Sequence, residues 1–500
     1  MTTASWGHGY VTDLEYHTAY HHDLAPINHH YLCLLQRIQP PTIDQPFVHL
    51  DLGSGDGFTN VLLAAANPHG QFYAVDFNPA HIRRGQTLAS LAGLDNITFV
   101  EASFEDLHRH GIPPADFVTC YGVFSWIDPG LRQALIDYVG ERLKPGGVFF
   151  VSYNTLPGWL AAMPLQRLIY EQVSRQSPGS DRVKEAIATL GQLDAAGGLF
   201  FKAYPSAQRR LKHMGEKSSR YLTHEYVNRH WQPLFQFEVD RLLAPAKLTR
   251  VGSLRIGDNF PERFVPKNMG EVIDSFPEDL QETALDLLLN QAFRRDLYIT
   301  GAVSLSPNRQ RQLLGRLRVA LARTPDKIAL NPQTYLGKLT LQRDRYQPLI
   351  DALAEAPRTL ADLAGALNVP FGDVLDMTAQ LAGYEQLHVL LPTPKDSEGL
   401  RRFNQQVLLD GEYHRQTLAL ASPEMGAGAV TRPLELTLLA VERSAPALAE
   451  RLAERLQGEG LALAEDGKTL DPADQQRAVE QFIAQFHQRR RPVLRQLGVI

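Results

Sequence analysis

The residues with the clearest chemical meaning lie in one glycine-rich stretch, DLGSGDG, at positions 51–57. An apolar run precedes this stretch and the helical pattern FTNVLLAAA follows it, so the sequence predicts a tight turn between a buried strand and a helix. Glycines in such a turn let a ligand approach backbone N–H groups that side chains would otherwise cover. The turn therefore predicts binding of a ligand, and the residues concerned are Asp51, Gly53, Gly55 and Gly57.

A second acidic residue strengthens this interpretation. Asp76 ends the next apolar run, QFYAVD, where its carboxylate is placed to accept hydrogen bonds from both ribose hydroxyls of a nucleoside. Two structural alternatives stay open: the glycines make a tight connection without a ligand, and Asp76 caps a helix that begins at Asn78-Pro79. The glycine turn, the acidic residue Asp76 and the spacing between them together favour a nucleoside-containing ligand.

These residues belong to a repeated pattern of short apolar runs and helical stretches from about residue 47 to 151. Such alternation is typical of βα units on a parallel sheet. The expected strands are FVHLDL, QFYAVD, ITFVEA, DFVTCY and GVFFVSY. The predicted fold class is therefore α/β, with a Rossmann-like domain.

The glycine pattern resembles that of the class I S-adenosylmethionine-dependent methyltransferases, in which an acidic residue stands two positions before G-x-G-x-G. This resemblance implies that Asp51 and the glycines hold the methionine part of S-adenosylmethionine and that Asp76 holds its ribose. In the family an Asp after the third strand meets the adenine amino group. Ser103 stands there in this chain, and its hydroxyl can accept the same hydrogen bond. The complete set of expected cofactor-binding residues is Asp51, Gly53, Gly55, Gly57, Asp76, Phe77, Ser103, Phe104 and Tyr121.

The acceptor side is predicted from the segments that follow the fourth and fifth strands, CYGVFSW and SYNTLPGW. Ligands of open parallel sheets lie beyond the carboxyl ends of the strands, so both segments should border the place where the methyl group emerges. We expect catalytic roles for Tyr153, Asn154 and Tyr121. The expected substrate-binding residues are Trp126, Trp159, Tyr16 and Tyr20, and plain core packing is the alternative for the aromatic residues. No residue is predicted as a general base.

A narrower resemblance rests on GVFSW and SYNTLPGW together with YLTHEYVN and FRRDLY further along the chain. In these segments the chain is similar to bacterial methyltransferases that carry a methyltransferase regulatory domain, a group that includes protein-lysine methyltransferases acting on outer-membrane proteins. Several members have His where Tyr121 stands here. The resemblance implies a protein acceptor methylated on a lysine nitrogen.

The rest of the sequence shows mostly helical patterns, which predict regulatory and winged-helix-like domains. We expect an N-terminal cofactor lid (1–45), the methyltransferase domain (46–165), a helical linker (166–217), the regulatory domain (218–301), a helical connector (302–345), a winged-helix-like domain (346–400) and a C-terminal helical region (401–500).

The composition of the chain restricts the kinds of partner that we expect. A net charge of −5 with dispersed basic residues argues against nucleic acid, and the predicted third helix of the winged-helix-like domain carries Asp373 and Asp376 without Lys or Arg. Histidines near the N-terminus lack a Cys or carboxylate cluster to complete a metal site, so no metal is expected. Two cysteines, no signal-like start and no long apolar run predict a cytoplasmic protein without a membrane partner.

Two other functions remain open from the sequence. One is methylation of oxygen or nitrogen on a small molecule or natural product, and the other is a non-enzymatic regulatory protein with a vestigial methyltransferase fold. The large C-terminal region favours a macromolecular acceptor, although it is equally compatible with a homodimer.

Overall fold

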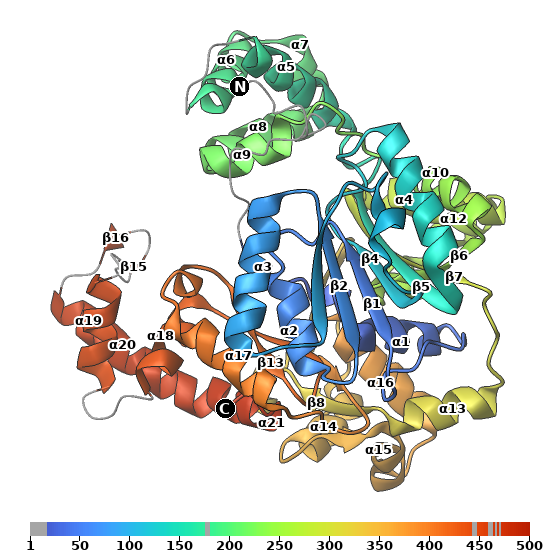
Figure 1. Cartoon of the computed structure of the whole chain (residues 1–500), viewed down its shortest axis with the longest axis vertical. Coiled ribbons are helices and arrows are strands. Elements are labelled where there is room, and N and C mark those ends of the chain that lie inside the picture. The colour runs from blue at the N-terminus through green and yellow to red at the C-terminus, as the bar shows by residue number, and fades with distance from the viewer. Residues whose placement is uncertain (1–17, 176–180, 443–447, 459–463, 466–467, 470–471) are drawn as a thin grey trace.

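The computed structural model describes residues 18–175, 181–442, 448–458, 464–465, 468–469 and 472–500, and its centre is one seven-stranded sheet (Figure 1). The strand order is β3-β2-β1-β4-β5-β7-β6. The strands are β1 (Val48–Leu52), β2 (Gln71–Asp76), β3 (Ile97–Glu101), β4 (Ala115–Cys120), β5 (Leu143–Asn154), β6 (Leu248–Ser253) and β7 (Phe293–Thr300). β1 to β5 are parallel, whereas β7 is antiparallel to both of its neighbours. The predicted Rossmann-like fold is confirmed.

Helices cover both faces of this sheet, which explains why the central strands are almost continuously apolar. α1 (Pro26–Leu35), α2 (Phe58–Ala66) and α3 (Pro79–Ala92) pack on one face, with Val148 and Phe150 of β5. α4 (Pro129–Arg142) and α10 (Gln236–Leu243) pack on the other, with Phe149 and Val151. Successive residues of β5 therefore enter different cores.

Five helices after β5 form a separate lobe, which stands apart from the sheet at the top of Figure 1. They are α5 (Met163–Ser174), α6 (Arg182–Ala195), α7 (Leu199–Ala203), α8 (Pro205–Gly215) and α9 (Ser219–Tyr226). This helical lobe has its own apolar core, to which Leu165, Ile169, Leu190 and Leu222 contribute. Trp159, just beyond β5, joins the same core, so the segment SYNTLPGW connects the sheet to the lobe.

The chain then returns to the sheet through α10, β6, α11 (Lys267–Asp274), α12 (Glu278–Leu289) and β7. β7 pairs with β5 along its whole length, from Val148 opposite Ile299 to Asn154 opposite Phe293. The segment expected to form the regulatory domain thus shares one sheet with the five parallel strands.

The following region contains a small sheet of order β11-β8-β12 surrounded by helices. The elements of this region, in chain order, are α13 (Pro307–Arg316), β8 (Arg318–Leu321), β9 (Gln333–Thr334), β10 (Gly337–Lys338), α14 (Arg343–Leu353), β11 (Arg358–Thr359), α15 (Leu360–Leu367), α16 (Phe371–Gly383) and β12 (Leu387–Leu390). The winged-helix interpretation of residues 346–400 stays a prediction, and β8 lies within the segment expected to be a helical connector.

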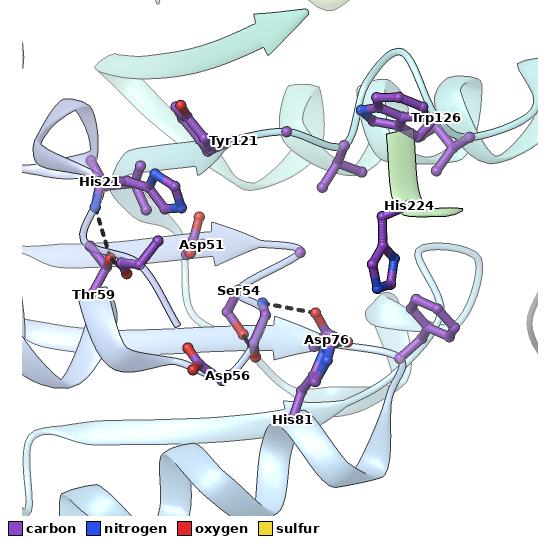
Figure 2. Close-up of a pocket in the computed structure, with 18 of the residues that line it drawn as sticks. His21, Asp51, Ser54, Asp56, Thr59, Asp76, His81, Tyr121, Trp126 and His224 are labelled. Carbon is purple, nitrogen blue, oxygen red and sulfur yellow. Dashed lines mark hydrogen bonds and ion pairs between the residues drawn. The ribbon is translucent and has the colours of Figure 1, made fainter. Parts of the chain in front are cut away.

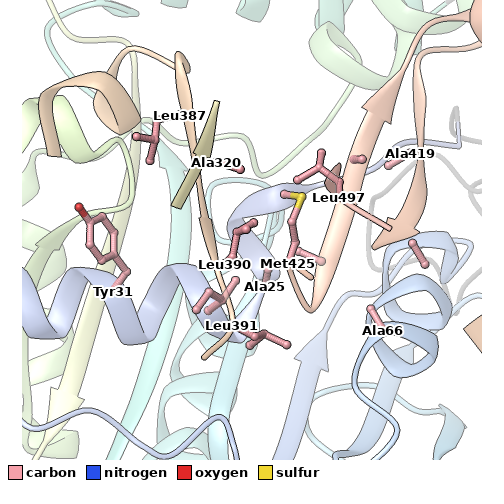
Figure 3. Close-up of a cluster of buried hydrophobic side chains, with 14 of the residues drawn as sticks. Ala25, Tyr31, Ala66, Ala320, Leu387, Leu390, Leu391, Ala419, Met425 and Leu497 are labelled. Atoms are coloured by element: carbon pink, nitrogen blue, oxygen red, sulfur yellow. The ribbon is translucent and has the colours of Figure 1, made fainter. Parts of the chain in front are cut away.

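The C-terminal region is mostly helical and packs back onto the first part of the chain. It comprises α17 (Glu398–Leu409), β13 (Leu418–Ser422), β14 (Ala427–Thr431), α18 (Pro433–Glu442), α19 (Leu448–Gly458), β15 (Ala464–Glu465), β16 (Lys468–Thr469), α20 (Pro472–Gln485) and α21 (Arg491–Gln496). α17 lies against α2 and α3, and the β13–β14 hairpin lies against α2. Figure 3 shows part of the resulting shared core, to which Ala66 of α2, Ala419 of β13 and Met425 belong. Within the described residues, no helix is both long and apolar enough to cross a bilayer.

Candidate active site

A cavity of about 510 Å³ opens at the carboxyl ends of β1, β2, β4 and β5 (Figure 2). This is the edge at which open α/β sheets bind their ligands. Figure 2 shows the carboxylates of Asp51, Asp56 and Asp76 on the β1 and β2 side, with Tyr121 and Trp126 on the β4 side. One side of the cavity is therefore acidic and hydrogen-bonding, and the other is aromatic.

At its glycines the turn brings backbone rather than side chains to the cavity. The N–H groups of Gly53 and Ser54 donate to the carbonyl oxygen of Val75 at 2.8 and 2.9 Å, which anchors the turn on β2. Gly55 has a φ of +57°, and no described atom lies within 4 Å of the point where a side chain would begin. The backbone of Gly55 is therefore accessible to a ligand, as the sequence predicts.

The environment of Gly57 differs from that of Gly53 and Gly55. It does not line the cavity, and a Cβ there would lie 2.5 Å from the ring of Phe99. Its φ of +75° places it in the left-handed region that favours glycine, directly before α2. Gly57 therefore permits close packing of α2 on β3, and we assign it no contact with a cofactor.

Asp76 is held at the end of β2 by three neighbours. Its Oδ2 accepts the N–H of Gly55 at 2.9 Å, and its Oδ1 accepts the N–H of Asn78 at 2.9 Å. The Nδ1 of His81 lies 3.2 Å from Oδ1. Burial lowers the pKa of His81, but the hydrogen bond and charge of Asp76 outweigh it and leave that pKa raised. The carboxylate is thus oriented, and Oδ2, which accepts one hydrogen bond, keeps a lone pair for a ribose hydroxyl.

Asp51 is also fixed before any ligand arrives. Its two carboxylate oxygens accept hydrogen bonds from Asn60 Nδ2 at 2.9 Å and from Thr119 Oγ1 at 2.6 Å. Burial raises the pKa of Asp51 to about 6, although both hydrogen bonds act in the opposite direction. Since the group still lies in the cavity wall, it presents an oriented acidic group to a cationic part of the ligand.

Another part of the cavity is lined mainly by apolar residues. Phe77, Ser103 and Phe104 all line the cavity, as expected for an adenine site. Val123 and Ile127 line it too, and Val123 touches the glycine turn so closely that a side chain at Gly53 would collide with it. Flat apolar walls with one hydroxyl suit a purine ring, so the residues present fit S-adenosylmethionine.

The N-terminal segment contributes to the lining of the cavity. Ala19, His21 and Leu24 line it, and the imidazole of His21 stacks on Tyr121 with ring centroids 4.0 Å apart. Burial lowers the pKa of His21 to about 4, so the stacked ring is neutral. Of the two tyrosines near the N-terminus that were predicted to bind substrate, Tyr16 lies outside the described residues. The other prediction, for Tyr20, is revised: its side chain does not line the cavity, and its hydroxyl accepts the N–H of Gly428 at 2.7 Å.

Two family models match the chain. Residues 50–149 match a methyltransferase domain, and residues 218–300 match a predicted methyltransferase regulatory domain. The first covers the strands and turns that build the cavity, and the second covers α9 to β7. The protein is a class I S-adenosylmethionine-dependent methyltransferase with a methyltransferase regulatory domain.

Relatives match the chain over nearly its whole length. The uncharacterized protein sll1526 of Synechocystis sp. is 32% identical over 510 residues, covering 99% of this chain and 100% of the relative. Among solved structures, PKMT2 from Rickettsia typhi in complex with AdoHcy has a TM-score of 0.69 at 18% identity, covering 94% of this chain and 97% of that chain. A second structure of PKMT2 from Rickettsia typhi gives a TM-score of 0.67 with the same coverage. The methyltransferase shares the fold of PKMT2, including the C-terminal region.

The structure places Asn154 in the cavity. It lies at the last position of β5, where its backbone N–H donates to Ser125 Oγ at 2.9 Å. Its side chain is only 6% exposed, and no described residue forms a hydrogen bond with Nδ2. A buried amide without a partner in a cavity wall is available to a ligand.

The prediction for Tyr153 has to be corrected. This residue is still within β5, so its side chain points to the opposite face of the sheet from Asn154 and enters the core with α4 and α10. Its hydroxyl donates to Asp296 Oδ2 at 2.7 Å, and Asp296 is also held by Arg294 at 2.7 Å. Tyr153 lies outside the cavity, so we assign it a structural role in joining β5 to β7.

Trp126 and Trp159 both line the cavity, as the sequence predicts for substrate-binding residues. They are bridged by Trp231, whose ring lies 6.3 Å from that of Trp126 and 5.0 Å from that of Trp159. The bridging residue was not predicted, because it lies in a segment without a motif. Together the three rings form an aromatic wall where the helical lobe meets the sheet.

Sequence reasoning also missed the contribution of α9. Tyr221, His224 and Glu225 line the cavity together with Ala292 and Phe293 of the regulatory segment. The motif YLTHEYVN contains the first three, but nothing in its spacing indicates which of them turn toward a site formed by distant strands. Within the described residues, no group of three or more His, Cys, Asp or Glu side chains is arranged to hold a metal.

Proposed function

We propose that this methyltransferase methylates the side-chain nitrogen of a lysine residue in a protein. The observation that carries the proposal is the composition of the acceptor end of the cavity, which combines aromatic residues with the side chain of Asn154, whose carbonyl oxygen is a hydrogen-bond acceptor. Tyr221, whose exposed fraction is 38%, marks the rim of this end, so a side chain that projects from a larger molecule has access. An aromatic, narrow and partly open site suits a long aliphatic side chain with a cationic tip.

The proposed roles follow from the geometry. Asp51 and the turn at Gly53 and Gly55 would hold the methionine part of the cofactor, and Asp76 would hold its ribose. When bound, S-adenosylmethionine supplies an electrophilic methyl group on a sulfonium sulfur. The contribution of the protein is to align the acceptor nitrogen with that methyl group and to exclude water.

A lysine acceptor reacts as the neutral amine, although its reference pKa is about 10.4. Burial against Trp126 and Trp159 disfavours the ammonium form and so assists the loss of its proton. The carbonyl oxygen of the Asn154 side chain would orient the amine through a hydrogen bond.

The comparison with known proteins supports the same acceptor class. PKMT2 of Rickettsia typhi is a protein lysine methyltransferase, and its fold is similar to 94% of this chain. The shared part includes the helical lobe and the C-terminal region, both of which lie outside the cofactor-binding strands.

The experiment is transfer of a labelled methyl group from S-adenosylmethionine into a host-cell lysate, with the lysate then separated by size. We expect the label in discrete protein bands, and methyl-lysine after hydrolysis of those bands. The Asp76→Ala variant serves as the background control, because it should bind the cofactor poorly. Label found only in small molecules would contradict the proposal and favour a small-molecule acceptor.

A further inference from the structure

α9 carries a carboxylate into the acceptor end of the cavity. Tyr221 and Glu225 lie one helical turn apart on α9, and both line the cavity. His224, between them in sequence, points toward Asp76 from the opposite side of the cavity, as Figure 2 shows. α9 thus contributes residues to two different parts of the site.

Arg210 of α8 shows on which side Glu225 lies. Its guanidinium stacks 4.0 Å from the ring centroid of Trp159, and the same positive charge acts on Glu225. Since Trp159 follows β5 directly, Glu225 lies on the acceptor side, beside the aromatic wall.

Glu225 lacks a partner within the protein as described. No residue in the described part of the chain donates a hydrogen bond to its carboxylate or lies within 4.0 Å as an ion-pair partner. Glu225 is partly buried, and no hydrogen bond from a described residue compensates the water lost around its carboxylate, although the charge of Arg210 acts on it. A cationic ligand would supply a hydrogen bond and a closer charge.

We propose that Glu225 binds the cationic nitrogen of the acceptor and accepts its proton before methyl transfer. This inference rests on the proposed function, because it requires an amine acceptor. It assigns a catalytic residue where the sequence offered no general base, and it places that residue on the regulatory segment, outside the cofactor-binding strands.

The step balances without a further reagent. The ammonium gives one proton to the Glu225 carboxylate and becomes the neutral amine. The amine nitrogen then forms a bond to the methyl carbon while the carbon–sulfur bond of the cofactor breaks and its electron pair passes to sulfur. The protonated Glu225 returns its proton to solvent before the next cycle.

The pKa of Glu225 suits this role. Burial raises it to about 7, while the charge of Arg210 lowers it. A base with a pKa near the working pH is the most effective proton acceptor. The carboxylate form is present above pH 7 and disappears below it, so activity should rise with pH through this region. The other titratable or charged groups near this end of the cavity or across it are Arg210, Tyr221, His224, Tyr226, Asp76 and His81.

The test uses n-butylammonium chloride, which has the length and charge of the end of a lysine side chain. We would titrate it by calorimetry at pH 8 into the full-length protein saturated with S-adenosylhomocysteine. Glu225→Gln keeps the size of the side chain and removes its charge, so the Kd should rise roughly tenfold or more. The matched control is Glu216→Gln, since Glu216 follows α8 with its side chain 63% exposed, and this variant should bind as the wild type does.

Two further measurements keep the result specific. The affinity of the wild type for n-butylammonium should fall below pH 7, whereas that of Glu225→Gln should not. Butan-1-ol, which has no charge, should bind both proteins equally. Equal affinity of the wild type and Glu225→Gln for n-butylammonium would overturn the inference, as would equal affinity of the wild type for the amine and the alcohol.

Failure of this inference is distinguishable from failure of the proposed function. Methyl-lysine formation in the lysate with no effect of Glu225→Gln on amine binding would remove only the role of Glu225. Label confined to small molecules would remove the lysine acceptor, whatever the amine titration shows. An unchanged Kd for S-adenosylhomocysteine in Glu225→Gln establishes that the variant is folded.

Discussion

The two ends of the cavity are built in different ways. The cofactor end comes from consecutive βα units between residues 51 and 104, and its carboxylates are already held by hydrogen bonds within the protein. The acceptor end is assembled from segments far apart in the sequence, including Trp126, Asn154, Glu225 and Phe293. Two of its polar groups, the Asn154 amide nitrogen and the Glu225 carboxylate, have no hydrogen-bond partner among the described residues.

This difference indicates how the enzyme separates its two tasks. A preorganised cofactor end costs little reorganisation when the nucleoside binds. The acceptor end lies where the helical lobe meets the sheet, and α9 contributes Tyr221, His224 and Glu225 to the lining of the cavity. Changes at the two ends should therefore have separable effects on cofactor binding and on methyl transfer.

The largest effect is expected at the cofactor end. Asp76→Ala should raise the Kd for S-adenosylmethionine roughly a hundredfold, because hydrogen bonds to a charged group contribute about 1.5–3 kcal/mol each. Calorimetric titration measures this Kd. Asp95→Ala, at an exposed position before β3, is the control and should leave it unchanged. A change in Kd of less than about threefold in Asp76→Ala would show that the carboxylate does not bind the ribose.

A smaller effect, on a different quantity, is expected at the acceptor end. Asn154→Ala should lower kcat/KM for methyl transfer to protein about ten- to a hundredfold, since orientation of the nucleophile is lost. The Kd for S-adenosylmethionine should not change. Asn268→Ala, on an exposed part of α11, serves as the control. Weaker cofactor binding in Asn154→Ala would mean that the two ends are not separable.

The smallest effect should come from a residue that belongs to neither end. Tyr153→Phe removes the hydroxyl that donates to buried Asp296, so the free energy of unfolding should fall by about 1–3 kcal/mol. Methyl transfer and cofactor binding should stay near those of the wild type. Chemical denaturation measures the first quantity, with Tyr204→Phe, an exposed position, as control. A large loss of methyl transfer without loss of stability would restore the catalytic role predicted from the sequence.

Much of the cofactor end is legible in the sequence because it depends on short-range patterns. The strand, the glycine turn and the helix at residues 48–66 follow from hydrophobic periodicity and from the backbone freedom of glycine. Asp76 follows from the end of the next strand. Gly57 shows the limit, because the ring of Phe99 that excludes a side chain there belongs to β3.

Both segments predicted to border the acceptor contribute residues to the cavity, but not every side chain predicted there lies in it. Successive side chains of a strand point to opposite faces, so Tyr153 and Asn154 point in opposite directions if both lie in β5. The polar segment SYNTLPGW does not indicate at which residue the strand ends. It is pairing with β7 up to Asn154 that keeps both residues in the sheet and sends their side chains to opposite faces.

The sequence by itself therefore determined the fold class, the cofactor and the side of the sheet where it binds. Only the tertiary structure decided that α9 brings Glu225 to the cavity and that β7 takes Tyr153 out of it. The physical reason is that local periodicity encodes strands, turns and helices, whereas contacts between distant segments depend on which apolar surfaces pack together when the chain folds.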